Sequence, residues 1–189
     1  ENTYGIFTLY LVMKKKSTPY QNRNLYLHAN NKVWYDKLLY PGRTTNCMIS
    51  MQASSEDSQY ASVISILTPM YMNELSAWKD TTPEHRGESY RSFKQEKTKQ
   101  LLRFIRSHGI DFSDNIEEIH TTTPLSYRDY TGTVDGSAYG IIKDYKCPQI
   151  GFVSTRSRLG NLFLTGQNLN VHGALGVTLT RQKPAPRAA

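Results

Sequence analysis

Alternating apolar and polar residues predict a series of short strands in the first third of the chain. In residues 24–29, Leu25 and Leu27 fall on one side of an extended backbone, and Tyr26 and His28 fall on the other. This two-residue period is typical of a half-buried strand. The expected strands are 6–13, 24–29, 47–53 and 60–68, with turn signals such as Pro41-Gly42 between them.

A different period follows in residues 88–107, where apolar positions recur at helical spacing among lysines and arginines. Gly109 can end this helix in the left-handed conformation, and Ile110 can then fold back onto the last turn. We also expect a short helix at 73–79, strands at 116–121 and 161–165, and a helix at 173–180. Residues 122–160 show few periodic runs and are expected to form a long loop region that carries function.

Strands that follow one another without intervening helices favour an antiparallel or mixed sheet over βαβ units. The sequence therefore predicts an α+β fold, with a mixed, largely antiparallel sheet and helices packed on one face. At 189 residues the chain is long enough to bury an ordinary core in one domain. The tail 181–189 is expected to be disordered.

The net charge of +7 suits an anionic partner, but the charge gathers only at Lys14–Lys16 and in the tail at Arg181, Lys183 and Arg187. No DNA- or RNA-binding signature accompanies it, so nucleic acid is not an expected partner. Cys47 and Cys147 stand a hundred residues apart and are expected to be free thiols in a reducing compartment, the cytoplasm. No apolar run is long enough to span a bilayer.

Several kinds of chemistry lack their sequence patterns. The five histidines do not have metal-site spacing, so no metal is expected. The nucleophile pattern GxSxG and the phosphate-binding patterns GxGxxG and GxxxxGK[ST] are also missing. The chain begins at Glu1 and not at a methionine, so it could be an excised piece of a longer protein, and no signal peptide is visible.

The segment NLFLTGQNLNVHGALGVTLT, residues 161–180, reads as an apolar strand, a polar turn and a helix with glycines near its start. Such a unit directs backbone N–H groups and the positive end of a helix dipole toward the space above the turn, where an anion such as a pyrophosphate can bind. A plain connection between strand and helix explains the same pattern, and the residues alone leave both readings open.

The same segment resembles the C-terminal flavin-binding motif of the phytoene desaturase, carotenoid isomerase and retinol saturase group of FAD-dependent oxidoreductases. TTTPLSYRDYTGTVDGSAYGI, residues 121–141, is similar to the stretch that passes the flavin and the substrate tunnel in that group. The resemblance implies a division into a substrate-binding domain at 1–160 and a segment at 161–180 that completes the FAD site. Half of that site would belong to an N-terminal Rossmann domain of the same protein.

The resemblance also implies roles for single residues. Gly166 would end the last strand under the flavin ribityl chain, and Gln167 stands where many relatives carry an acid, although it could be a simple turn residue. The implied cofactor-binding residues are Gly166, Gln167, Asn168, His172, Gly173, Ala174 and Leu175. Arg128, Tyr130 and Tyr139 would line the channel of an apolar polyene substrate. An arginine that satisfies loop carbonyls, and tyrosines that pack the loop onto the sheet, are the structural alternative.

The reaction implied is desaturation, saturation or isomerisation of a carotenoid- or retinoid-like lipid, with hydride chemistry supplied by the flavin. Peripheral contact with a membrane would fit such a substrate, and the Lys14–Lys16 cluster could assist it. A solvated hairpin end is the structural alternative for that cluster. The competing function is a non-catalytic module that presents the open sheet to a lipid or a protein.

Overall fold

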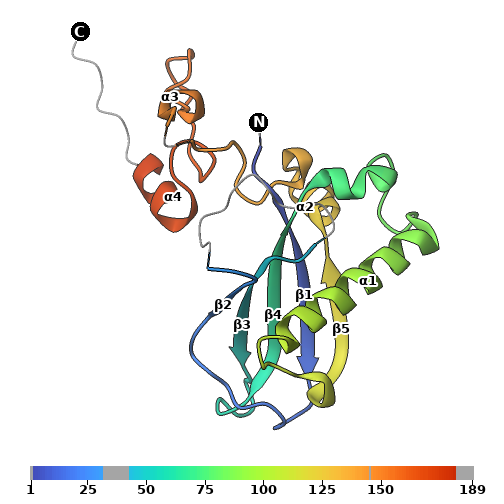
Figure 1. The fold of residues 1–189 in the computed structure, drawn as a ribbon. Helices are drawn as coiled ribbons and strands as arrows, with labels where there is room; N and C mark the ends of the chain where they lie inside the picture. The colour runs from blue at the N-terminus through green and yellow to red at the C-terminus, as the bar shows by residue number, and fades with distance from the viewer. Residues whose placement is uncertain (1, 32–42, 145, 182–189) are drawn as a thin grey trace.

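The computed structural model of the chain describes residues 2–31, 43–144 and 146–181 (Figure 1). The expected turn at Pro41-Gly42 and nearly all of the expected disordered tail lie outside the described residues. The described part has an α+β fold, as predicted from the sequence. Its N-terminal two thirds form a sheet with a long helix across one face, and its C-terminal part is a lobe of short helices and loops.

Five antiparallel strands form one open sheet in the order β2-β3-β4-β1-β5. The strands are β1 (Gly5–Met13), β2 (Leu25–His28), β3 (Asn46–Ala53), β4 (Ala61–Met70) and β5 (Ile116–Thr122). All five were expected from the sequence within a few residues. The first strand of the chain lies near the centre, paired with β4 on one side and β5 on the other.

The core lies on one face of this sheet. In β1, Phe7, Leu9 and Leu11 point to this face and are fully buried. Leu9 and Leu11 are in register with Ile66 and Ile64 of β4. Each such side chain contributes roughly 1.5–3 kcal/mol by leaving water. The residues of β1 that point to the opposite face are half-buried, apart from Thr8. The sheet therefore has one dry face and one partly open face.

Helix α1 (Gly87–Arg106) covers the dry face with an apolar stripe that includes Tyr90, Leu101 and Ile105. It ends as expected: Gly109 adopts a φ of +79°, its N–H donates to the carbonyl of Arg106, and the N–H of Ile110 donates to the carbonyl of Ile105. This hydrogen-bond pattern is the Schellman motif. The short helix expected at 73–79 is a 3-10 helix, η1 (Met72–Trp78).

The expected long loop at 122–160 is wrong in its first part, which contains helix α2 (Pro124–Thr131). The side chain of Thr123 accepts a hydrogen bond from the N–H of Leu125, Pro124 occupies the first turn, and Gly132 follows the helix with a φ of +69°. These three residues are the usual signals for the beginning and end of a helix. The helix is only eight residues long, so its hydrophobic periodicity is too short to reveal it.

The expected strand at 161–165 is also wrong. Only one isolated bridge forms there, between Arg156 and Phe163. Leu162, Phe163 and Leu164 are largely exposed, because no neighbouring strand of the described chain pairs along the segment. An apolar run of this length is consistent with a strand only where another strand can pair with it.

The remaining helices are short. They are the 3-10 turns η2 (Ser113–Asn115) and η3 (Val134–Gly136) and the helices α3 (Pro148–Gly151) and α4 (Gly173–Arg181). Helix α4 confirms the helix expected at 173–180. Within residues 2–31, 43–144 and 146–181, no helix combines the length and the apolar character that a membrane crossing requires.

Candidate functional site

The two segments that carry the family resemblance lie against each other. The ring centroids of Tyr139 and His172 are 5.2 Å apart. Gly140 packs against Asn168 so closely that a Cβ atom at Gly140 would lie 2.4 Å from the Asn168 side-chain oxygen, and its φ of +71° also favours glycine. The candidate site is therefore where residues 137–143 meet residues 166–172, a region that we call the junction.

Hydrogen bonds join the turn at residues 166–170 to α4 and to His172, which follows the turn. The N–H of Gly166 donates to Thr180 Oγ1 over 3.2 Å. His172 Nδ1 lies 3.3 Å from the main-chain oxygen of Gln167, a hydrogen bond that requires the proton on Nδ1. The His172 ring is thereby held between this carbonyl and Tyr139.

Two glycines of the turn region present bare backbone to the surroundings. Gly166 and Gly173 have φ values of +134° and +72°, and a Cβ atom at either would meet nothing within 4 Å. Gly173 begins α4, and the next residues, Ala174 and Leu175, are exposed in its first turn. The positive end of the helix dipole and an accessible backbone therefore coincide, as an anion-binding turn requires.

An apolar groove of about 200 Å³ lies beside the junction, on the partly open face of the sheet. Tyr139 forms part of its wall, and Ile6, Met48 and Leu67 contribute from β1, β3 and β4. The Tyr139 ring packs edge-on against Tyr4, with 6.1 Å between centroids. Burial raises the pKa of Tyr4, and Tyr139 and Tyr71 raise it further, so the phenol stays neutral. An uncharged ligand suits such a groove.

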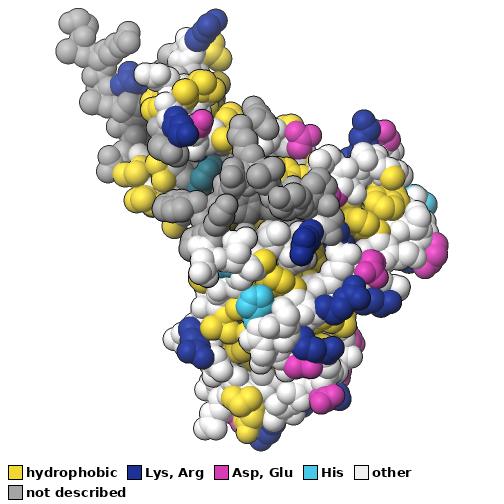
Figure 2. Space-filling view, viewed as in Figure 1, with side chains coloured by type: hydrophobic (Ala, Val, Ile, Leu, Met, Phe, Trp, Pro, Cys, Tyr) yellow, Lys and Arg dark blue, Asp and Glu magenta, His cyan; other side chains and the backbone are white. Residues whose placement is uncertain are grey.

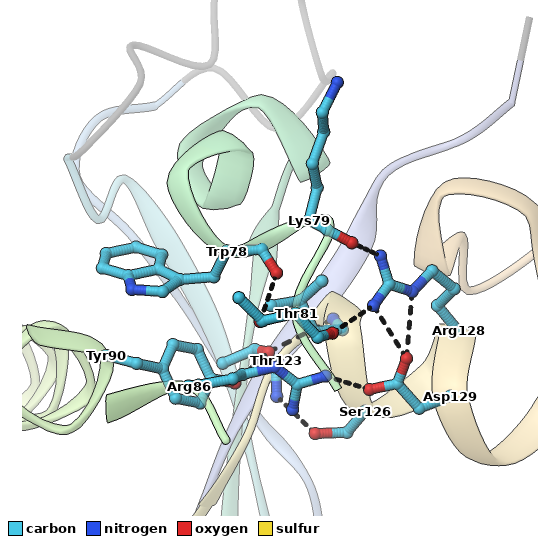
Figure 3. Close-up of polar contacts among 10 residues, drawn as sticks. Trp78, Lys79, Thr81, Arg86, Tyr90, Thr123, Ser126, Arg128 and Asp129 are labelled. Atoms are coloured by element: carbon cyan, nitrogen blue, oxygen red, sulfur yellow. Dashed lines mark hydrogen bonds and ion pairs between the residues drawn. The ribbon is translucent and has the colours of Figure 1, made fainter. Parts of the chain in front are cut away.

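Arg128 is not among the residues that line the groove, and its side chain points toward main-chain oxygens of the segment after η1 (Figure 3). Its guanidinium donates to the carbonyls of Lys79 and Thr81 and to the carboxylate of Asp129. These contacts match the structural alternative stated above for the arginine. Tyr130, on α2, is 78% exposed. Of the three expected channel residues, Tyr139 is the one that lines the groove. A substrate role for all three stays a prediction.

Asp129 also pairs with Arg86, which stands immediately before α1. The two side chains are only 12% and 9% exposed, and Arg86 Nε has no hydrogen-bond partner in the described chain. We call Arg86, Arg128 and Asp129 the latch. Its hydrogen bonds tie α2 to the beginning of α1 and to the segment after η1.

A second contact supports the latch. The hydroxyl of Tyr90, on α1, lies 2.8 Å from Thr123 Oγ1, which also accepts the N–H of Leu125. Thr123 is fully buried. One threonine thus begins α2 and binds it to α1, so the helix that follows β5 cannot shift without loss of a buried hydrogen bond.

Sequence reasoning missed Arg86, Asp129 and Lys143. Arg86 and Asp129 are 43 positions apart and no short motif joins them, so their pairing depends on the tertiary fold. Lys143 donates to three main-chain oxygens in the C-terminal part, on Gly151, Asn168 and Leu169. Every residue has a main-chain carbonyl group, so no sequence pattern predicts which carbonyls a lysine will bind.

Other candidate chemistry is weaker in the structure. Burial raises the pKa of Cys47 to about 12, which leaves this free thiol protonated and unreactive. Lys15 and Lys16, from the basic cluster, pair with Glu56 and Asp57. No group of three potential metal ligands gathers anywhere in the described residues.

Replacement of Asp129 by alanine should destabilise the protein strongly. It leaves the nearly buried Arg86 without its counter-charge, a change that typically costs about 3–5 kcal/mol. Urea unfolding at neutral pH measures the loss. The matched control is Glu56→Ala, which breaks a pair whose side chains are 68% and 81% exposed and should cost no more than about 1 kcal/mol. Equal losses in the two variants would contradict a structural role for the latch.

The latch should also make stability depend on acid. Burial alone would raise the pKa of Asp129, but hydrogen bonds from Arg86 and Arg128 outweigh it and hold the pKa below its ordinary value. A carboxylate with a depressed pKa stabilises the fold above its unfolded pKa, and this contribution disappears as pH falls through the folded pKa. The difference in unfolding free energy between wild type and Asp129→Asn should therefore shrink below about pH 4. A constant difference down to pH 2 would refute this.

The sequence matches no protein-family model and no curated protein.

Proposed function

We propose that the chain is the substrate-binding part, with a flavin-contact segment, of an FAD-dependent oxidoreductase that acts on a carotenoid- or retinoid-like polyene lipid. The proposal starts from the resemblance of residues 121–141 and 161–180 to that enzyme group. It is supported by the contact between these segments at the junction, through Gly140 and Asn168 and through Tyr139 and His172. Segments that serve one site in a folded protein need to meet in space.

The observation that carries the proposal is the distribution of exposed apolar side chains. Ten of the fifteen large hydrophobic residues that are exposed in the described chain lie between Ile150 and Leu179. Figure 2 shows hydrophobic side chains gathered on this C-terminal lobe. Large exposed apolar surfaces mark sites where another domain or molecule binds. We assign this surface to the N-terminal Rossmann domain of the same protein, which would supply the GxGxxG turn.

The turn and the start of α4 fit a dinucleotide cofactor. Gly166 and Gly173 leave the backbone accessible, and the exposed first turn of α4 offers N–H groups to a pyrophosphate. Residues 166–168 and 172–175 would hold the FAD. The flavin, when bound, supplies the hydride chemistry, while the protein positions the substrate and excludes water.

The apolar character of the groove supports the proposed substrate class. Ile6, Met48, Leu67 and Tyr139 present apolar surface, and none of the described residues that line the groove is Asp, Glu, Lys or Arg. A polyene has no charge to neutralise and few hydrogen-bonding groups, so an apolar wall is sufficient to bind it. Desaturation, saturation and isomerisation would all act on a substrate of this apolar kind, so the groove suits each of the three reactions.

The competing proposal is a non-catalytic module that binds a lipid or a protein on the same open face of the sheet. It requires the groove but not the accessible glycines at 166 and 173. The gene sequence upstream of residue 1 distinguishes the two functions. A predicted strand followed by GxGxxG there favours the flavoenzyme, and its absence favours the module.

An FAD titration tests the proposed cofactor. The full-length gene product should bind FAD and show flavin absorption, whereas the chain 1–189 should bind at least about 100-fold more weakly, because each half of a site contributes part of the binding free energy. Gly173→Ala, in the full-length protein, should weaken binding about tenfold by strain and by a methyl group over the helix start.

The control for this titration is Gly109→Ala. Gly109 has a similar φ of +79° and similarly open surroundings, but it lies at the end of α1. It should leave FAD affinity unchanged. Micromolar binding by the chain 1–189 alone, or equal effects of the two alanines, would rule out the split site.

Peripheral membrane contact completes the proposal. The chain should float with vesicles that contain phosphatidylserine at low salt, and salt should release it, because basic residues are attracted to anionic lipid. Lys14→Ala, Lys15→Ala and Lys16→Ala together should abolish flotation. The matched control removes three exposed charges from α1, in Arg91→Ala, Lys99→Ala and Arg103→Ala. Wild-type protein that stays in solution at low salt would exclude contact through this cluster.

A further inference from the structure

Lys143 brings together two separate parts of the C-terminal lobe. Its ammonium group donates to the main-chain oxygen of Asn168 over 3.0 Å and to that of Leu169 over 2.6 Å. A third hydrogen bond goes to the main-chain oxygen of Gly151. An ammonium has three N–H groups, so these three oxygens use all of them.

Neutral oxygens alone compensate this charge in the described chain. No ion pair joins Lys143 to an Asp or Glu among the described residues. Burial lowers the pKa of Lys143, which reflects the cost of taking its charge out of water. A partly desolvated ammonium binds carbonyl oxygens more strongly than a neutral donor does. Hydrogen bonds to the ammonium therefore keep the three carbonyl groups directed toward Lys143 Nζ.

The turn at 166–170 is fixed on two sides. On one side Gly140 packs against the Asn168 side chain. On the other, the N–H of Val153 donates to the main-chain oxygen of Leu169 over 3.3 Å and lies 3.2 Å from Asn170 Oδ1. Lys143 adds hydrogen bonds both to Gly151 and to this turn.

We propose that Lys143 is the positioning residue of the junction: its ammonium holds the main chain of the 166–170 turn in the conformation that receives the anionic part of the cofactor. The cofactor in this statement rests on the proposed function. The hold on the turn does not, because it follows from the three hydrogen bonds. All three N–H groups of Lys143 donate to main-chain oxygens, so the side chain would not bind the cofactor directly. Its effect on the cofactor would come from the position of the turn.

Backbone dynamics of the chain 1–189 test the hold on the turn. NMR order parameters of Asn168 and Leu169 should be near about 0.85 in the wild type and should fall below about 0.6 in Lys143→Met, which keeps the apolar stem and removes the charge. The order parameters of β1 and β4 should not change, which shows that the variant remains folded. Lys99→Met, which removes an exposed charge on α1, is the matched control and should leave the turn rigid.

Chemical rescue separates charge from packing. In Lys143→Ala the missing atoms correspond to propylammonium, and adding it should restore the rigid turn, whereas propanol should not. A turn that stays equally ordered in both Lys143 variants, or that propanol restores as well, would overturn the proposed role of the ammonium.

The cofactor part is tested separately in the full-length gene product. Lys143→Met should weaken FAD binding about tenfold, which corresponds to the loss of one charge-assisted hydrogen bond to the turn, and Lys99→Met should not. A mobile turn with unchanged FAD affinity would overturn the link between Lys143 and the cofactor. A wild-type protein without FAD affinity would instead refute the proposed function. The NMR order parameters would still show whether Lys143 keeps the turn rigid.

Discussion

A single apolar face of an antiparallel sheet must be kept dry, and most of the structure follows from that constraint. Helix α1 can cover this face because its stripe of Tyr90, Leu101 and Ile105 belongs to the same core as Phe7, Leu9 and Leu11 of the interior strand β1. Leu75 of η1, Leu125 of α2 and Phe112 complete this core beside α1, while the opposite face of the sheet stays partly open. The groove lies on the open side, and Tyr139 of the junction forms part of its wall.

The charged contacts are placed where the elements around the core need a fixed orientation. Arg86 and Asp129 join the beginning of α1 to α2, and Lys97 joins α1 to Glu74 of η1 over 2.6 Å. A buried ion pair contributes little net stability, since desolvation offsets the attraction, but loss of one partner is costly. Such pairs penalise wrong arrangements, so they set how the short segments dock on a core that the hydrophobic effect alone would bury without a preferred orientation.

The sequence was sufficient for the elements with a clear period and insufficient for those that depend on distant partners. The five strands and α1 were predictable because alternation and helical spacing reflect one buried face. Helix α2 had its signals in Thr123, Pro124 and Gly132, but too few turns for a period. The apolar run at 161–165 predicted a strand, but a strand forms only where a second strand pairs with it, and the described chain supplies only an isolated bridge. The latch, and the contact of Gly140 with Asn168, join residues far apart in the chain, which no local pattern specifies.

The edge strand β5 has a consequence for association between molecules. Its outer side has no neighbouring strand in the described chain, so its backbone groups could pair with a strand of another copy. Glu117 and Glu118 lie on this edge and are exposed. Two copies that approached edge to edge would bring these carboxylates together, and their repulsion opposes the strand addition that begins aggregation. The acidic pair on β5 thus disfavours pairing between this edge and the same edge of another copy.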